Sequence, residues 1–168
     1  MEDEISYNPV TFRNGNLDKT RHQGVEFTLD WQFRKLARFL ANYTFQEAYF
    51  RDGANRDKDV PLVPHHMANA AIEVYLPWSL TLRPEVRYVG EQYFGSDNDN
   101  SSTKLDSYAI VNLYLRWQPD WKAFGVAKPT AFVGVENLTN KSYVPVGYET
   151  FSGLSYYPAP EINFRGGI

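Results

Sequence analysis

Polar side chains occupy every second position between Leu80 and Tyr88. The polar positions are Thr81, Arg83, Glu85 and Arg87, and the apolar positions between them include Leu80, Leu82, Val86 and Tyr88. Successive side chains of a β-strand point to opposite faces, so this pattern predicts a strand with one apolar and one charged face. One such strand fits a soluble sheet equally well. The pattern recurs along the chain, however, and the recurrence indicates a barrel.

The clearest alternation lies at 24–31, where Val25, Phe27, Leu29 and Trp31 are separated by Glu26, Thr28 and Asp30. We expect about eight strands, at 2–12, 24–31, 37–49, 68–74, 80–88, 106–118, 130–138 and from Glu161 onward. Short connections are expected at 32–35, 76–79 and 118–128, long irregular loops at 51–61, 95–104 and 139–160, and a turn at Arg13–Asn16. Strands of roughly 9–13 residues are long enough to cross a bilayer when tilted.

The tryptophans support a membrane location. All four lie in or beside the short connections, at Trp31, Trp78, Trp117 and Trp121. In an up-and-down meander every second turn lies at the same end, so these side chains should form one ring. An indole has an apolar body and a polar N–H, which suits the membrane interface. The alternative is that they cap a soluble core. We predict an all-β, antiparallel up-and-down transmembrane β-barrel.

Composition excludes several other classes. The mean hydropathy is -0.49, and the sequence contains no apolar run long enough for a transmembrane helix. Barrel strands remain compatible with this value because only half of their residues face lipid. The net charge of -3 provides no basic field for nucleic acid. The chain has no cysteine, so thiolate chemistry and disulfides are absent.

No set of residues indicates an enzyme, a cofactor or a metal site. His65 and His66 are adjacent, so on a strand they would point to opposite faces, and we expect them to mark the start of a strand. The segment 97–102 lacks the residues that complete a calcium loop, and we expect a solvated loop tip. Six charges fall on the face opposite the apolar one: Arg83, Glu85, Arg87, Arg116, Glu136 and Arg165. They would cover the outside of a soluble barrel, or line the lumen of a membrane barrel and pair with each other.

Five segments resemble the C-terminal barrel of TonB-dependent outer-membrane receptors: 16–26, 60–69, 87–93, 105–112 and 133–143. The most specific pieces are Gly24-Val-Glu26 and Val135-Glu-Asn-Leu138 with Tyr143. The resemblance implies a 22-stranded barrel with an N-terminal plug. Residues 1–168 would be its last strands, about eight in number, without the plug. By the same mapping the short turns face the periplasm, and loops 13–20, 51–61, 95–104 and 139–160 face outside.

Receptors of this family import ferric siderophores, haem, cobalamin or similar nutrients with energy passed on by TonB. The resemblance therefore implies a bacterial outer-membrane location, a ferric siderophore or similar ligand, outer-membrane lipid as surroundings, and TonB as a partner through the plug region. Ligand contact would come from the long loops. Their candidate residues are the arginines Arg51 and Arg56 and the aromatic residues Tyr148, Phe151, Tyr156 and Tyr157.

Two alternatives differ from this hypothesis in testable ways. A self-contained eight-stranded membrane barrel with a structural or adhesive role would pair its two end strands with each other. A soluble β-barrel that binds a small apolar ligand would turn Val25, Phe27 and Leu29 inward.

Overall fold

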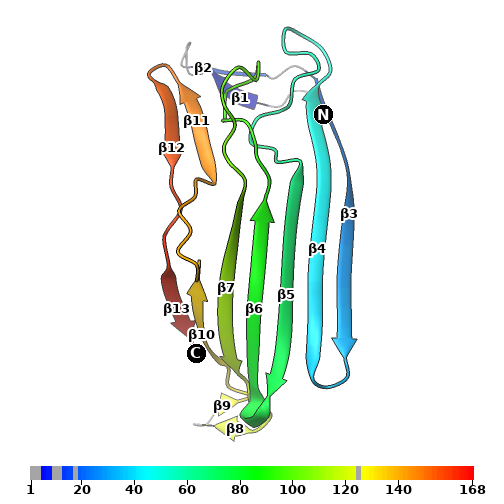
Figure 1. The fold of residues 1–168 in the computed structure, drawn as a ribbon, viewed down its shortest axis with the longest axis vertical. Helices are drawn as coiled ribbons and strands as arrows, with labels where there is room; N and C mark the ends of the chain where they lie inside the picture. Colours follow the sequence, from blue (N-terminus) through cyan, green and yellow to red (C-terminus); the bar gives the residue numbers. More distant parts are fainter. Residues whose placement is uncertain (1–4, 9–12, 17–18, 124–125) are drawn as a thin grey trace.

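The computed structural model describes residues 5–8, 13–16, 19–123 and 126–168. Seven strands form one antiparallel sheet in which each strand pairs with its neighbours in chain order (Figure 1). They are β3 (Thr20–Phe33), β4 (Ala37–Phe50), β5 (His66–Leu76), β6 (Leu80–Val89), β7 (Tyr108–Trp117), β10 (Ala131–Glu136) and β13 (Asn163–Gly167). This order confirms the predicted up-and-down meander. β3 and β4 have 14 residues each, enough to cross a bilayer.

Cross-strand pairing separates the side chains onto two faces. The apolar residues of β3 share one face of this edge strand, with Val25 69%, Phe27 59% and Leu29 42% exposed. Their partners on β4 continue the same face, since Phe27 stands opposite Tyr43. The alternative of a soluble β-barrel requires these side chains to point inward. The structure contradicts it, because they lie on the face opposite Asp30 and the charged residues that pair across the sheet.

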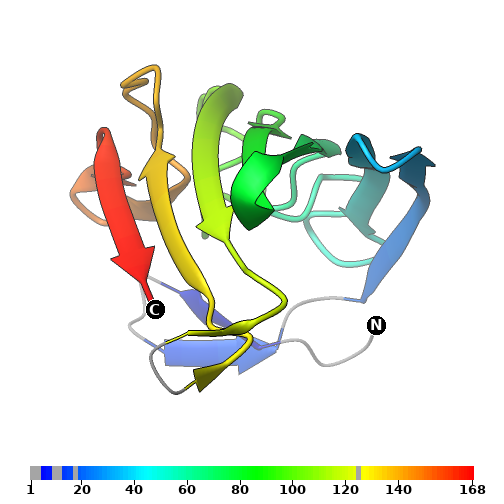
Figure 2. The same ribbon diagram turned by 90° about the horizontal axis from the view of Figure 1, so that it is seen from below.

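The sheet is strongly curved in cross-section (Figure 2). On β7 the residues Tyr108, Ile110 and Asn112 are buried, whereas the intervening Ala109 is exposed. Tyr143 packs against Tyr108 and Ile110, and the Tyr108 and Tyr143 rings are 4.3 Å apart. Charged residues from four strands line one cavity: Glu73, Arg83, Glu85, Arg116 and Arg165. The face that carries the charged residues is therefore the concave one, as in the lumen of a barrel.

The short connections lie together at one end of the sheet (Figure 1). They are the turn at 34–36, the 3-10 turn η1 (Pro77–Ser79) and the segment with the short pair β8 (Lys122–Ala123) and β9 (Val126–Ala127). All four tryptophans lie in or beside these connections, and the rings of Trp117 and Trp121 are 6.0 Å apart. This confirms their predicted clustering at one end. Across the described ranges, no helix has the length and apolarity needed to cross a membrane.

Two parts of the predicted strand map are wrong. The stretch 139–160, expected to be irregular, contains a hairpin of β11 (Val146–Thr150) and β12 (Gly153–Tyr157). Its strands lack apolar alternation because they pair only with each other and lie outside the seven-stranded sheet. Arg13–Asn16, expected to be a turn, forms β2 and pairs with β1 (Ile5–Asn8) in a separate two-stranded sheet. Backbone pairing outweighs the Asn-Gly turn preference there, and residues 9–12 of the expected first strand lie outside the described residues.

The sheet is open. β3 and β13 form its opposite edges and do not pair with each other. The alternative of a self-contained barrel requires that pairing, so the structure does not support it. The seven strands have the form of a barrel wall segment.

Candidate functional site

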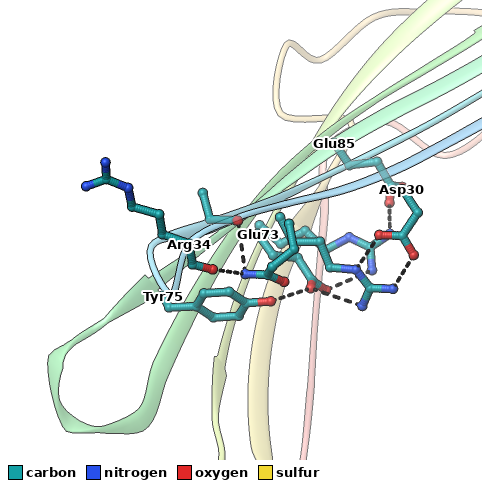
Figure 3. Close-up of polar contacts among 9 residues, drawn as sticks. Asp30, Arg34, Glu73, Tyr75 and Glu85 are labelled. Atoms are coloured by element: carbon teal, nitrogen blue, oxygen red, sulfur yellow. Dashed lines mark hydrogen bonds and ion pairs between the residues drawn. The ribbon is translucent and has the colours of Figure 1, made fainter.

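Charged side chains form a continuous network across the concave face (Figure 3). Arg38 on β4 donates from Nε and Nη2 to the two carboxylate oxygens of Asp30 on β3, at 2.8 and 2.6 Å. Its Nη1 also lies 3.9 Å from Glu73 on β5, a carboxylate that is only 7% exposed. The other side of Glu73 faces Arg83 on β6, at 3.7 Å. The network thus alternates anion and cation from strand to strand, which holds four strands in register.

The network continues onto β7. Arg83 donates to Glu85 at 2.9 Å, and Asn112 on β7 also donates to Glu85, at 3.3 Å. A second cluster joins Glu136 to Arg165, with Nε and Oε1 3.0 Å apart. The predicted pairing of lumen charges is thus confirmed for Arg83, Glu85, Glu136 and Arg165, whereas none of the ion pairs within the described ranges involves Arg87 or Arg116.

The loop after β6 is folded back on itself, and the prediction of a solvated loop tip at 97–102 is wrong for Asp97, whereas Asp99 and Ser101 are exposed. Asp97 is fully buried, and its two carboxylate oxygens accept hydrogen bonds from the backbone N–H groups of Ser101 and Ser102 at 2.8 and 3.2 Å. Burial raises the pKa of Asp97, because the charged form is poorly solvated there. The carboxylate acts as the internal frame of this loop.

The β11–β12 hairpin is attached to the same loop by a reciprocal aromatic contact. A Cβ atom at Gly95 would lie 2.4 Å from the ring of Tyr148, and one at Gly147 would lie 2.6 Å from the ring of Phe94. The backbones also pair, with Gly95 N–H donating to the Gly147 carbonyl at 2.8 Å and Glu149 N–H donating to the Gly95 carbonyl at 2.8 Å. Only glycine leaves space for each ring, so the two glycines fix the docking position of the hairpin.

The structure places the four predicted aromatic contact residues on this hairpin. Tyr148 and Tyr157 form an edge-to-face pair with ring centroids 5.9 Å apart. Tyr156 instead packs edge-on against the buried Phe94, at 5.2 Å. Phe151 lies in the tight turn of the hairpin and is 82% exposed. The hairpin therefore presents aromatic surface at the end opposite the tryptophans (Figure 1).

The two predicted arginines belong to a different loop. Arg51 and Arg56 lie in the connection between β4 and β5, called here the arginine loop, and both are exposed. The Nε atom of Arg56 lies 3.7 Å from the Asp57 carboxylate. The arginines and the aromatic hairpin share one end of the sheet (Figure 1) but are carried by separate loops. None of the hydrogen bonds or ion pairs given for the described residues joins the arginine side chains to the hairpin.

Several residues that organise these loops were not singled out from the sequence for this role. Asn137 is buried, and its amide oxygen accepts from Lys141 N–H at 2.8 Å while its amide nitrogen donates to the Lys141 and Pro160 carbonyls. Asn140 accepts from Ile162 N–H at 2.9 Å. The available signal was the tolerance of asparagine for left-handed backbone, and both residues adopt it, with φ of 53° and 49°.

A charged pair closes the base of the loop between β6 and β7, called here the middle loop. Lys104 Nζ lies 2.7 Å from Glu91 Oε1 and 4.8 Å from the centre of the Tyr93 ring. The hydrogen bond with Glu91 raises the pKa of Lys104, and the same bond lowers the pKa of Glu91. Both groups are therefore held in their charged forms across neutral pH.

The adjacent histidines have separate partners. β5 begins at His66, as predicted, and the Nδ1 atom of His66 lies 2.8 Å from the Tyr43 hydroxyl. His65 Nε2 lies 3.4 Å from Asp59. In the part of the chain that the structure describes, no three His, Cys, Asp or Glu side chains come together as metal ligands.

An open, curved antiparallel sheet with a charged concave face, an apolar convex face and tryptophans at one end defines the wall of a transmembrane-type β-barrel. The sequence matches the family described as TonB dependent receptor-like, beta-barrel, over residues 1–138. The chain belongs to this family, which consists of outer-membrane receptors and transporters rather than enzymes. Comparison with curated protein sequences gives no significant match.

Solved structures with similar folds include an uptake receptor and two transporters. The ferric yersiniabactin uptake receptor FyuA from Yersinia pestis aligns with 92% of this chain and 24% of its own, at 24% identity and a TM-score of 0.72. The ferric citrate transporter FecA in its unliganded form and the copper transporter OprC each align with 98% of this chain and 26% of their own, at 16% identity and a TM-score of 0.71. At these identities the likeness shows the fold. The chain spans about a quarter of the length of these receptors.

Proposed function

We propose that this chain is part of the barrel of an outer-membrane receptor that takes up a ferric siderophore or a similar iron chelate. Its membership of the TonB-dependent receptor barrel family supports an uptake role. The observation that carries the ligand class is the aromatic hairpin, whose tip residue Phe151 is 82% exposed at the loop end of the sheet. Exposed aromatic groups that no neighbouring segment covers mark a binding surface.

The ligand would be anionic and partly apolar. Tyr148, Phe151, Tyr156 and Tyr157 supply flat apolar surface with hydroxyl groups at three positions. Arg51 and Arg56 on the loop between β4 and β5 supply positive charge, and an arginine fork fits carboxylate or similar oxyanions. The arginines would attract the chelate and the hairpin would hold it, so the two loops have different parts in binding.

The remaining partners follow from the same proposal. The apolar convex face, with Phe27 and Val25 exposed, would contact outer-membrane lipid. The charged concave face would enclose the path of the ligand. TonB would act through a plug region, which corresponds to none of the seven strands described above.

The test uses the full receptor with both arginines replaced, as Arg51→Gln and Arg56→Gln. Uptake of radioactive iron is measured with ferric citrate, a ferric catecholate and a ferric hydroxamate as probes. We expect the KM for the transported anionic chelate to rise several-fold with little change in maximal rate. The matched control is Arg34→Gln with Lys35→Gln, which removes the same charge at the opposite end of the sheet (Figure 1). Equal KM values in the two double variants would refute the role of the arginines.

A further inference from the structure

One side chain joins two of the long loops. The amide oxygen of Asn100 accepts a hydrogen bond from Asp59 N–H at 2.7 Å, and the amide nitrogen of Asn100 donates to the Asp59 carbonyl at 3.0 Å. Asn100 lies in the loop between β6 and β7, and Asp59 lies in the loop between β4 and β5. A single amide therefore satisfies both backbone groups of one residue across 41 positions of sequence, as a neighbouring strand would.

The position of this amide is fixed from within its own loop. Asn100 has a φ of 53°, a left-handed conformation that asparagine tolerates better than most residues. Its amide nitrogen also donates to the Asp97 carbonyl at 3.2 Å. The buried Asp97 in turn holds the backbone of Ser101 and Ser102. The turn around Asn100 is thus a preformed clamp.

The same loop holds the aromatic hairpin on its other side. Besides the backbone pairing at Gly95, the side chain of Gln92 donates to the Pro145 carbonyl at 2.8 Å. Ser102 Oγ donates to Glu149 Oε1 at 3.3 Å. The loop between β6 and β7 therefore lies between the arginine loop and the hairpin and is bonded to both.

We infer that Asn100 is a positioning residue that couples the arginine loop to the aromatic hairpin, so that the two ligand-contacting loops of the proposed function move as one unit. Among the described residues, the arginine loop and this middle loop are also joined by a bond from Leu62 N–H to the Tyr93 carbonyl at 3.1 Å, closer to the start of β5. The arginine loop is anchored to β4 as well, where Phe50 N–H donates to the Lys58 carbonyl at 3.0 Å and Asp57 N–H donates to the Phe50 carbonyl at 2.9 Å. Asn100 therefore links a loop already attached to β4 with the middle loop, and loss of its amide loosens that link and the frame against which the hairpin packs.

Three variants of the full receptor distinguish the effect of the Asn100 amide hydrogen bonds from the effect of the left-handed backbone at this position. Asn100→Gly keeps the left-handed backbone and removes both amide bonds to Asp59. Asn100→Asp keeps the acceptor for Asp59 N–H and loses the donor. The control Asn98→Gly lies in the same loop, and the side chain of Asn98 forms none of the inter-loop bonds given above.

Hydrogen exchange of the receptor without ligand is the measurement, followed in peptides that cover 51–61 and 143–157. We expect Asn100→Gly to accelerate exchange in both segments about tenfold relative to the control, because two hydrogen bonds are lost. Asn100→Asp should give an intermediate rate. An unchanged exchange rate in 51–61 would show that Asn100 does not hold the arginine loop. Faster exchange in 51–61 without any change in 143–157 would show that the arginine loop and the hairpin are not coupled.

The role in uptake rests on the proposed function and has its own readout. With the same iron chelates, Asn100→Gly should raise the KM for uptake several-fold at an unchanged maximal rate, and Asn100→Asp should recover part of the affinity. Faster exchange in both segments with an unchanged KM would leave the coupling intact and refute the contribution of these loops to ligand binding. The two failures are therefore distinguishable.

Discussion

The ring of Tyr114 on β7 lies directly over the α-carbon of Gly134 on β10. The two residues stand opposite each other in the ladder, and a Cβ atom at Gly134 would lie 2.5 Å from the ring. The ring is held there by a hydrogen bond from its hydroxyl to Glu136 at 3.0 Å and by Arg165, whose guanidinium lies 5.0 Å from the ring centre. A glycine in mid-strand usually weakens a sheet, but here it makes room for the aromatic side chain of the neighbouring strand.

Replacement of Gly134 by alanine should destabilise the barrel by about 1–3 kcal/mol, because the Tyr114 ring must move and lose its bond to Glu136. Urea unfolding of the full receptor in detergent, followed by tryptophan fluorescence, measures this change. In a Tyr114→Ala background the same replacement should cost much less. An equal loss of unfolding free energy in the two backgrounds would show that the Tyr114 ring is not the reason for glycine at position 134.

Glu73 separates two arginines on the concave face, as Figure 3 shows for the labelled carboxylate and its neighbours. Glu73→Gln removes the anion between Arg38 and Arg83, and we expect a loss of about 1–3 kcal/mol in unfolding free energy. Glu26→Gln serves as the control, because Glu26 is an exposed carboxylate on β3 and lies on the charged face of the sheet with Asp30. A Glu73 variant as stable as the Glu26 variant would contradict the cross-strand network.

Phe151 and Phe94 should respond in opposite ways to replacement by alanine. Phe151 is exposed in the hairpin turn, so its removal should leave unfolding free energy within about 0.5 kcal/mol while weakening uptake of the iron chelate. Phe94 is buried against Gly147 and Tyr156, so its removal should cost about 3–5 kcal/mol of packing, observed as local unfolding of the hairpin. Limited proteolysis within 143–157 would report the second effect. Uptake that is insensitive to Phe151→Ala would remove the tip from the proposed binding surface.

The Glu91–Lys104 pair should show a defined pH dependence. Because Lys104 lowers the pKa of Glu91, the contribution of the pair is present above the ordinary glutamate pKa of about 4.3 and is lost as the pH falls through the folded-state pKa. Lys104→Gln should raise the pKa of Glu91 toward its ordinary range. An NMR titration of the Glu91 carboxyl carbon measures the shift, with Lys58→Gln as the control. A Glu91 pKa that is the same in both variants would contradict the pairing.

The sequence predicted the parts of the fold that depend on one-residue alternation. The positions of β3 to β7 follow from patterns such as Val25, Phe27 and Leu29, because a barrel wall with two different faces imposes period two on every strand. The position of the tryptophans at one end of the sheet was also predictable, because every second turn of a meander lies at the same end. The hairpin β11–β12 was missed because its exposed strands carry no such pattern.

The candidate site was less accessible to sequence reasoning. The aromatic residues were identified from their place in a long loop that the family resemblance assigns to the outside. Their arrangement depends on two small spaces, above Gly95 and above Gly147, which no local pattern reveals. Asn100, Asn137 and Asn140 looked like ordinary loop asparagines, yet all three adopt positive φ and bridge backbone groups distant in sequence. Loop organisation of this kind depends on tertiary contacts, which the order of residues does not show.

Site-directed spin labelling of β3 shows which face of the sheet meets lipid. The 168-residue sequence contains no cysteine, so single labels can be attached in turn at positions 25 to 30, with any cysteine elsewhere in the full receptor replaced first. In lipid bilayers, labels at Val25, Phe27 and Leu29 should be accessible to oxygen dissolved in the membrane, and labels at Glu26, Thr28 and Asp30 should not. Accessibility without a period of two, or with the opposite phase, would show that the apolar face of this strand does not meet lipid.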